Sequence, residues 1–142
     1  MRKLAAIACA VVCVIVSASA PAAEDTLAVI VHRDRHVAMS VEELSTIYRK
    51  KRRFWDDGTP IVPLNRESGS PEREAFSRRV LGGASVALAG YWNQEYFHGI
   101  LPPATLSSSD AVKRYVAADR NAIGYVWSSE VDESVGVLLR LE

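Results

Sequence analysis

Apolar residues occur in two patterns along the chain, continuous runs and runs with a helical repeat. The segments 27–32 (LAVIVH) and 122–127 (AIGYVW) are continuous and rich in β-branched or aromatic residues. Such runs predict strands that are buried on both faces. A short strand is expected at 60–64, and the alternating apolar residues of 135–141 predict a last strand with one better-buried face.

Helical repeats fill most of the sequence between these strands. Ser40 and Glu43 have the spacing of a capping box, which predicts a helix over 41–49. A second helical segment is expected over 84–97, and an amphipathic one over 109–119.

Within 84–97, the side chains of Leu88, Trp92 and Tyr96 recur every four residues. That spacing places them on one face, which we expect to pack against the rest of the protein.

The segment NRESGSPEREAF (65–76) predicts a turn followed by a helix start. Ser70 is a favourable N-cap, and Pro71 fits the first helical position because the missing N–H costs nothing there. Gly82 and Gly83 are expected to end this helix.

Strands that alternate with helices predict an α/β fold, with a largely parallel sheet flanked by helices. The segment 23–142 has the length of one domain with its own core, and no internal repeat or low-complexity linker divides it.

The beginning of the chain has the pattern of a cleaved secretory signal. Arg2 and Lys3 precede an apolar stretch that is too short to span a bilayer, and small residues follow it. We expect a signal peptide over 1–22, cut near Ala22 or Ala23, and a periplasmic product without stable membrane insertion. Both cysteines lie inside this segment, so we expect no disulfide and no cysteine chemistry in the exported protein.

The charge balance argues against nucleic acid as a partner, and one local cluster of positive charge stands out. The chain carries 17 basic and 17 acidic residues, so no global positive field favours nucleic acid. Residues 49–53 are five consecutive cations. They could bind an acidic partner, but their place at a helix C-terminus favours a solvated helix end.

Candidate catalytic and metal-binding groups are sparse. No nucleophile and base occur at a recognisable spacing, so we expect no enzymatic activity and no cofactor. His32, Asp34 and His36 alternate, which would put them on one side of an extended segment, but the pattern favours a solvated loop over a metal site.

Residues 66–70 contain the parts of an oxyanion site. Arg66 supplies a planar fork of donors, Ser68 and Ser70 supply hydroxyl groups, and Gly69 lets the backbone turn into the positive end of a helix. These four residues are the candidate ligand-binding residues. The competing interpretation is an ordinary capped helix that follows an arginine.

The order of these motifs resembles the periplasmic phosphate-binding proteins of ABC transporters, and more closely their single-lobe relatives. The resemblance is carried by SVEELSTIY, RRFWDDGTPIVPLNR, GSPEREAF and NAIGYV. It implies one lobe of a type II periplasmic-binding-protein fold over 23–142. It also implies that Arg66, Ser68, Gly69 and Ser70 correspond to phosphate-binding positions.

Two residues depart from the family pattern. Pro71 replaces a glycine whose amide helps to hold the anion, and Glu72 replaces a threonine whose hydroxyl does the same. A carboxylate in the first helical turn competes with an anion for the positive helix end.

Two functions stay open on these residues. One is a secreted solute-binding-like module with weak phosphate or oxyanion binding, linked to transport or sensing. The other is a protein-interaction or adaptor domain of the cell envelope that has lost its ligand, with an envelope protein or a second copy as partner.

Overall fold

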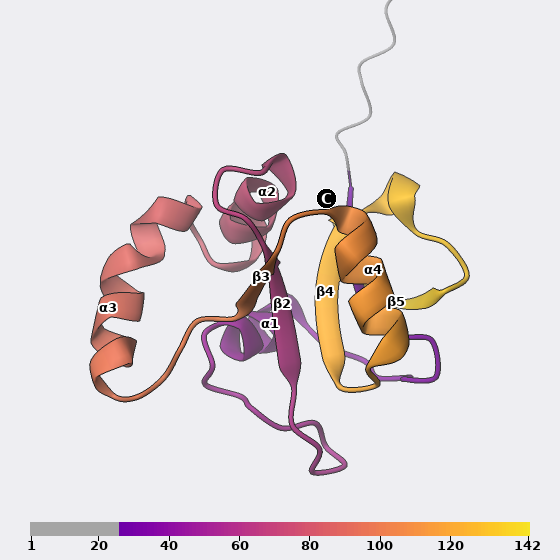
Figure 1. Ribbon diagram of the computed structural model, residues 1–142, viewed down its shortest axis with the longest axis horizontal. Helices are drawn as coiled ribbons and strands as arrows, with labels where there is room; N and C mark the ends of the chain where they lie inside the picture. The colour runs from indigo at the N-terminus through magenta and orange to yellow at the C-terminus, as the bar shows by residue number, and fades with distance from the viewer. Residues whose placement is uncertain (1–25) are drawn as a thin grey trace, which may run out of the picture.

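The computed structural model describes residues 26–142, and the predicted signal peptide at 1–22 lies outside them. The chain forms strands that alternate with helices, as the sequence predicts (Figure 1). In chain order the elements are β1 (Leu27–His32), α1 (Val41–Tyr48), β2 (Val62–Arg66), α2 (Pro71–Val80), η1 (Ser85–Leu88), α3 (Ala89–Phe97), β3 (Ala104–Leu106), α4 (Ser109–Ala118), β4 (Ala122–Trp127), η2 (Ser128–Glu130) and β5 (Val135–Leu141).

The strands form one mixed sheet with the order β3-β2-β4-β1-β5. β2 is parallel to both β3 and β4, whereas β1 is antiparallel to both β4 and β5. Four strands therefore run in one direction and β1 runs against them. The expected α/β lobe is confirmed. The sheet was expected to be largely parallel, and the two pairs that β1 makes are antiparallel instead. A continuous apolar run indicates burial on both faces and carries no information on the direction of neighbouring strands.

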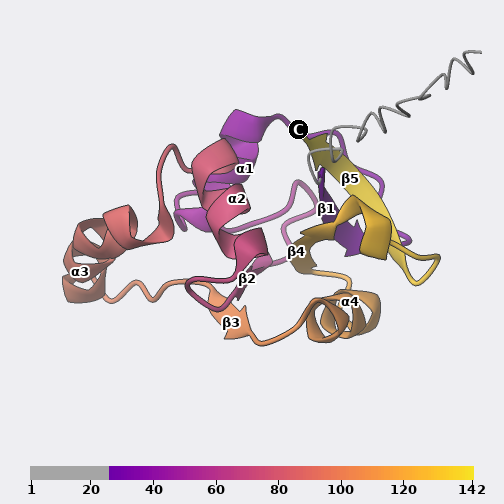
Figure 2. The same ribbon diagram turned by 90° about the horizontal axis from the view of Figure 1, so that it is seen from above.

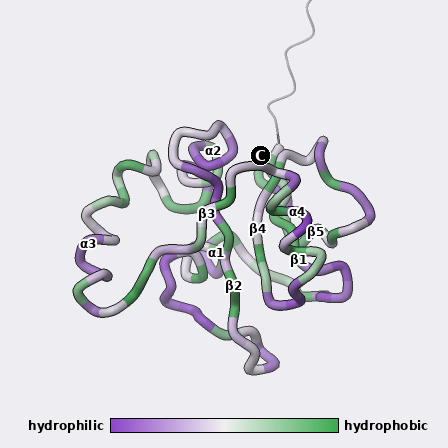
Figure 3. The backbone as a smooth tube through the Cα atoms, in the orientation of Figure 1, coloured by the Kyte–Doolittle hydropathy of each residue, from purple (hydrophilic) through white to green (hydrophobic). Residues whose placement is uncertain are grey.

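Residues 27–31 of β1 are all apolar because the strand is buried on both faces. Leu27, Val29 and Val31 belong to one core cluster, whereas Ala28 and Ile30 belong to the other. α1 and α2 cover the first face, and α4 covers the second (Figure 2). Hydrophobic residues accordingly concentrate in the central strands (Figure 3).

α4 lies unusually close to the sheet at Gly124 in β4. A Cβ atom built on Gly124 would lie 2.6 Å from a methyl carbon of Val112, which is below van der Waals contact. Any larger residue at this position would force the buried Val112 side chain to shift. This close contact places the start of α4 beside the end of β2.

β2 and β4 separate toward their carboxyl ends, where two buried tyrosines replace backbone pairing. The paired residues are Val62 with Ala122 and Pro63 with Ile123. Beyond them, the Tyr48 hydroxyl lies 2.9 Å from the carbonyl oxygen of Leu64 and 3.2 Å from that of Ile123.

On the same seam, the Tyr125 hydroxyl accepts a hydrogen bond from the Arg66 backbone N–H at 3.1 Å. It donates to the Asn65 side-chain oxygen at 2.8 Å. Burial raises the pKa of both Tyr48 and Tyr125, so both hydroxyls stay protonated and able to donate.

The predicted helix over 84–97 is corrected by the structure. It is divided into η1 and α3, and α3 has no buried residue. Of the face expected to pack, Leu88 is partly buried against the first core cluster and Trp92 is half-buried, whereas Tyr96 is 66% exposed. Figures 1 and 2 both show α3 standing away from the sheet. Four-residue spacing indicates a helix face but does not say whether a neighbour covers it.

Two strand predictions also change. β2 spans 62–66 instead of 60–64, because Pro60 forms an isolated bridge with Phe54 before the strand begins. β3 is absent from the strands predicted above, because three residues are too few to show an apolar repeat. Parallel pairing with β2 supplies the stabilisation that the sequence of β3 does not indicate.

Candidate anion-binding site

Arg66 is the last residue of β2 and lies where two helices begin. Because β2 and β3 are parallel, the helices that follow them, α2 and α4, start at the same edge of the sheet (top of Figure 1). Ligands of open α/β sheets bind at this edge, outside the carboxyl ends of the strands. The fold thus places Arg66 where a ligand is expected.

The guanidinium of Arg66 is buried and already has partners. Its side chain is 8% exposed. The Nη1 group donates to the Ser109 hydroxyl at 2.9 Å and lies 3.4 Å from a carboxylate oxygen of Glu72. The Nε and Nη2 groups donate to the two carboxylate oxygens of Glu67 at 3.1 and 3.0 Å.

These ion pairs favour the charged forms of Arg66 and Glu67. The hydrogen bonds that Arg66 donates to Glu67, together with the charge of Glu72, raise the pKa of Arg66 despite its burial. The same guanidinium holds the pKa of Glu67 below its usual range. Glu67 is therefore an internal anion bound to the fork that an external anion would use. Its side chain is 45% exposed, so it can turn away from Arg66 into solvent.

A pocket of about 280 Å³ opens beside this guanidinium. It is lined by Arg66, Glu72 and Glu130 together with residues 107–110, which form the start of α4. Ser108 caps α4 by accepting a hydrogen bond from the Ala111 backbone N–H. The partial positive charge of this helix start adds to that of Arg66.

The turn Ser68–Ser70 faces a different set of partners. The Ser70 hydroxyl accepts from the Arg73 backbone N–H at 3.2 Å, which confirms the predicted N-cap. Gly69 has a positive φ of 88°, as the turn requires. The Ser68 hydroxyl lies 3.2 Å from the hydroxyl of Ser85. None of these three residues lines the pocket beside Arg66.

Glu74 supplies the anion on this side of the segment. Its carboxylate accepts hydrogen bonds from the hydroxyl and the backbone N–H of Ser85. Those two bonds, with smaller contributions from the charge of Arg78 and the Gly69 backbone, hold the pKa of Glu74 below its usual range. The Glu74 contacts therefore tie the turn to η1.

Four residues of the candidate site are not among those predicted from the sequence. Ser109, Glu67, Glu74 and Ser85 all contact residues of the predicted site or their partners. Two of them had a signal: Ser109 ends a run of three serines before an amphipathic helix, and Glu67 directly follows Arg66. Ser85 and Glu74 meet only through the tertiary fold.

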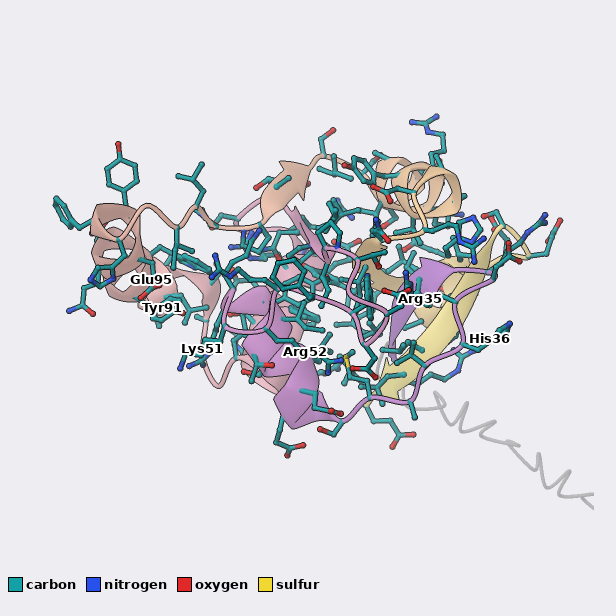
Figure 4. All side chains as sticks on the ribbon, turned by 90° about the horizontal axis from the view of Figure 1, so that it is seen from below. Arg35, His36, Lys51, Arg52, Tyr91 and Glu95 are labelled. Carbon is teal, nitrogen blue, oxygen red and sulfur yellow. The ribbon has the colours of Figure 1, made fainter. Side chains whose placement is uncertain are left out.

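The remaining candidates are distributed elsewhere. The Asp34 backbone N–H donates to His32 Nδ1, and His36 is exposed (Figure 4). Within residues 26–142, no group of three potential metal ligands gathers.

Two residues of the basic run 49–53, Arg49 and Arg52, make contacts with other groups of the protein. Arg49 donates to the carbonyl oxygen of Leu81 at 2.8 Å. Arg52 lies 3.5 Å from Glu43 and 2.9 Å from Asp56. These contacts leave less positive charge available to a partner than five consecutive cations suggest.

The family model for the PBP superfamily domain matches residues 15–136. The chain belongs to this family. A comparison with curated proteins gave no match. None of the helices in residues 26–142 combines the length and the apolarity that a membrane-spanning segment needs.

Solved structures support the same assignment. The chain is similar to a putative phosphate ABC transporter substrate-binding protein from Clostridium perfringens, solved with bound phosphate, with 29% identity and a TM-score of 0.66. It is also similar in fold to an ABC-type phosphate transport receptor from Vibrio cholerae, with 20% identity and a TM-score of 0.64. The matches cover 80% of this chain but only 44% and 45% of those chains. The chain therefore spans less than half the length of these relatives.

Proposed function

We propose that the protein is a secreted, non-catalytic, single-lobe solute-binding module that binds phosphate or another small oxyanion weakly, in the service of transport or sensing. One observation carries the proposal: a buried guanidinium, that of Arg66, lines a pocket at the start of α4. A buried arginine and a helix start both favour an anion at that point. The similar Clostridium perfringens protein, solved with bound phosphate, supports the choice of ligand.

Weak binding follows from the internal carboxylates. An anion that takes the bidentate face of Arg66 must displace Glu67, and it then lies near Glu72, whose carboxylate is 3.4 Å from Nη1. Displacement and like-charge repulsion both oppose binding. Pro71, at the first position of α2, also removes a backbone donor.

The residues proposed to hold the anion are Arg66 first, with Ser68, Gly69 and Ser70 as the second location. Arg66 and the α4 start share a pocket, whereas in the Ser68–Ser70 turn the Ser68 hydroxyl pairs with Ser85 and the Ser70 hydroxyl accepts from the α2 backbone. A ligand at the turn would therefore have to break more internal contacts than one at Arg66.

Calorimetric titration with phosphate and sulfate at low ionic strength tests this proposal. We expect saturable binding in the wild-type protein and its loss in Arg66→Ala. Arg114→Ala is the matched control, because Arg114 is an exposed arginine on α4. Binding that survives Arg66→Ala, or that is lost equally in Arg114→Ala, would contradict a site at Arg66. Thermal melting gives a second readout, since ligand at a hundred times its dissociation constant adds about 2.7 kcal/mol to the free energy of unfolding.

A second candidate function is supported by α3. Its residues and those next to it leave large apolar side chains exposed: Val86 74%, Tyr96 66%, Phe97 86% and Leu101 63%. The Tyr91 hydroxyl donates to the Arg49 carbonyl oxygen at 2.6 Å. This hydrogen bond connects α3 to the end of α1. Tyr91 and Glu95 lie on the side of α3 that faces the Lys51 loop (Figure 4). An apolar surface of this kind favours an interaction or adaptor domain of the cell envelope.

Sedimentation velocity over a range of concentrations tests this second candidate for self-association, and capture from envelope extract tests it for a protein partner. Phe97→Ser should weaken either association, because it removes the most exposed aromatic ring of α3. A protein that stays monomeric and captures nothing would contradict the candidate.

A further inference from the structure

The pocket beside Arg66 carries more negative than positive charge. Its lining includes one guanidinium, that of Arg66, and three carboxylates, those of Glu72, Asp110 and Glu130. The carboxylate of Glu67 pairs with the same guanidinium. A simple dianion that reaches Arg66 therefore meets a negative field, whereas a ligand that also carries a positive group does not.

Glu130 differs from the other carboxylates of this lining. Glu72 is paired with Arg66, and Asp110 lies 3.5 Å from the Lys113 ammonium group. Glu130 accepts a hydrogen bond from the Trp127 backbone N–H at 3.1 Å, which fixes one of its oxygens. The ion pairs formed within residues 26–142 do not include Glu130. The Glu130 carboxylate is thus fixed by a backbone hydrogen bond and has no ion-pair partner among the described residues.

The positive part of the pocket is equally defined. Arg66 Nη1 and the Ser109 hydroxyl are 2.9 Å apart, and residues 107–109 bring the start of α4 to the same lining. Groups suited to an oxyanion and a carboxylate suited to a cation therefore share a space of about 280 Å³. That volume fits a small molecule of a few heavy atoms.

We propose that this pocket takes a small zwitterion, in which an oxyanion group binds Arg66 at the α4 start and an ammonium group pairs with Glu130. This inference rests on the proposed function, because it uses the same guanidinium. The oxyanion group displaces the half-exposed carboxylate of Glu67. The ammonium group offsets the negative charge that otherwise opposes the oxyanion.

Calorimetric titration with two matched probes tests this ligand class. O-phosphoethanolamine and ethyl phosphate have similar size and the same phosphate monoester group, but only the first has an ammonium group. We expect O-phosphoethanolamine to bind about fivefold more tightly, as one partly exposed ion pair provides. Glu130→Gln should remove this preference, since the amide oxygen can still accept from Trp127 while the charge is gone. Glu133→Gln, an exposed position nearby, should keep it.

The outcomes separate this inference from the proposed function. Equal binding of the two probes to the wild-type protein, lost for both in Arg66→Ala, would overturn the zwitterion and retain the oxyanion site. A preference that persists in Glu130→Gln would also overturn the inference. Failure of both probes and of inorganic phosphate to bind would overturn the proposed function itself.

Discussion

Arg66 and the Ser68–Ser70 turn, the two halves of segment 66–70, form one predicted site in the sequence but have different surroundings in the fold. Arg66 points to a pocket, and its bidentate partner Glu67 is half exposed. The Ser68–Ser70 turn is held by Ser85, Glu74 and the capped start of α2. Both halves are satisfied by internal carboxylates. The difference predicts that an anion binds at Arg66, whose internal partner can turn into solvent and which lines a pocket, and not at the turn.

The largest expected effect comes from Phe76, which supports both halves. Phe76 is fully buried, and its ring stacks on Tyr125 with centroids 4.0 Å apart. We expect Phe76→Ala to lower the free energy of unfolding by about 3–5 kcal/mol, because the cavity cannot close completely. Urea denaturation measures this loss, and a cost near zero would mean that the core under the segment is not packed as described.

Tyr125→Phe should affect the Arg66 half alone. The change leaves the Arg66 backbone N–H and the Asn65 side-chain oxygen without their partner, and both residues are buried. We expect a cost of about 1–3 kcal/mol in urea denaturation. An unchanged midpoint would show that the tyrosine hydroxyl does not hold the end of β2.

The fold could be predicted from the sequence further than the site could. The continuous run of β1, the capping box of α1 and the N-cap Ser70 are local patterns, and all three are confirmed. The direction of β1, the existence of β3 and the isolation of α3 depend on tertiary neighbours that no local pattern encodes.

Only the local part of the candidate site could be predicted, because the rest depends on tertiary neighbours. Arg66 and the turn adjoin in sequence, so their donors could be recognised together. Ser109 is 43 residues from Arg66, and Ser85 is 11 residues from Glu74. Their roles arise only when α4 and η1 pack beside α2. Sequence spacing therefore predicted the donors but not the internal groups that satisfy them.

Glu72→Gln should sharpen the contrast between the halves by strengthening binding at Arg66. The substitution removes a negative charge 3.4 Å from Nη1 while keeping the size of the side chain. We expect the affinity for phosphate to rise about tenfold in calorimetry. Glu42→Gln, an exposed glutamate in the first turn of α1, is the control. An equal gain in both variants would indicate a general charge effect instead of a local one.

Glu74→Gln should give the smallest effect, a change in acid sensitivity confined to the turn half. The folded-state pKa of Glu74 lies below the usual value of 4.5, so its charged form stabilises the fold above that pH. The stability advantage of wild type over Glu74→Gln should therefore shrink as pH falls through the folded-state pKa. Urea denaturation between pH 7 and acid conditions measures it, and a constant difference would contradict the pairing with Ser85.

A phosphate titration followed by amide NMR tests the central claim most directly, because it asks which half holds the anion. The account predicts that the backbone signals of Ser108, Ser109 and Asp110, with the side-chain signal of Arg66, shift in a saturable way. The Gly69 and Ser70 signals should shift less. Saturable shifts centred on Gly69 and Ser70, with the α4 start unaffected, would contradict it.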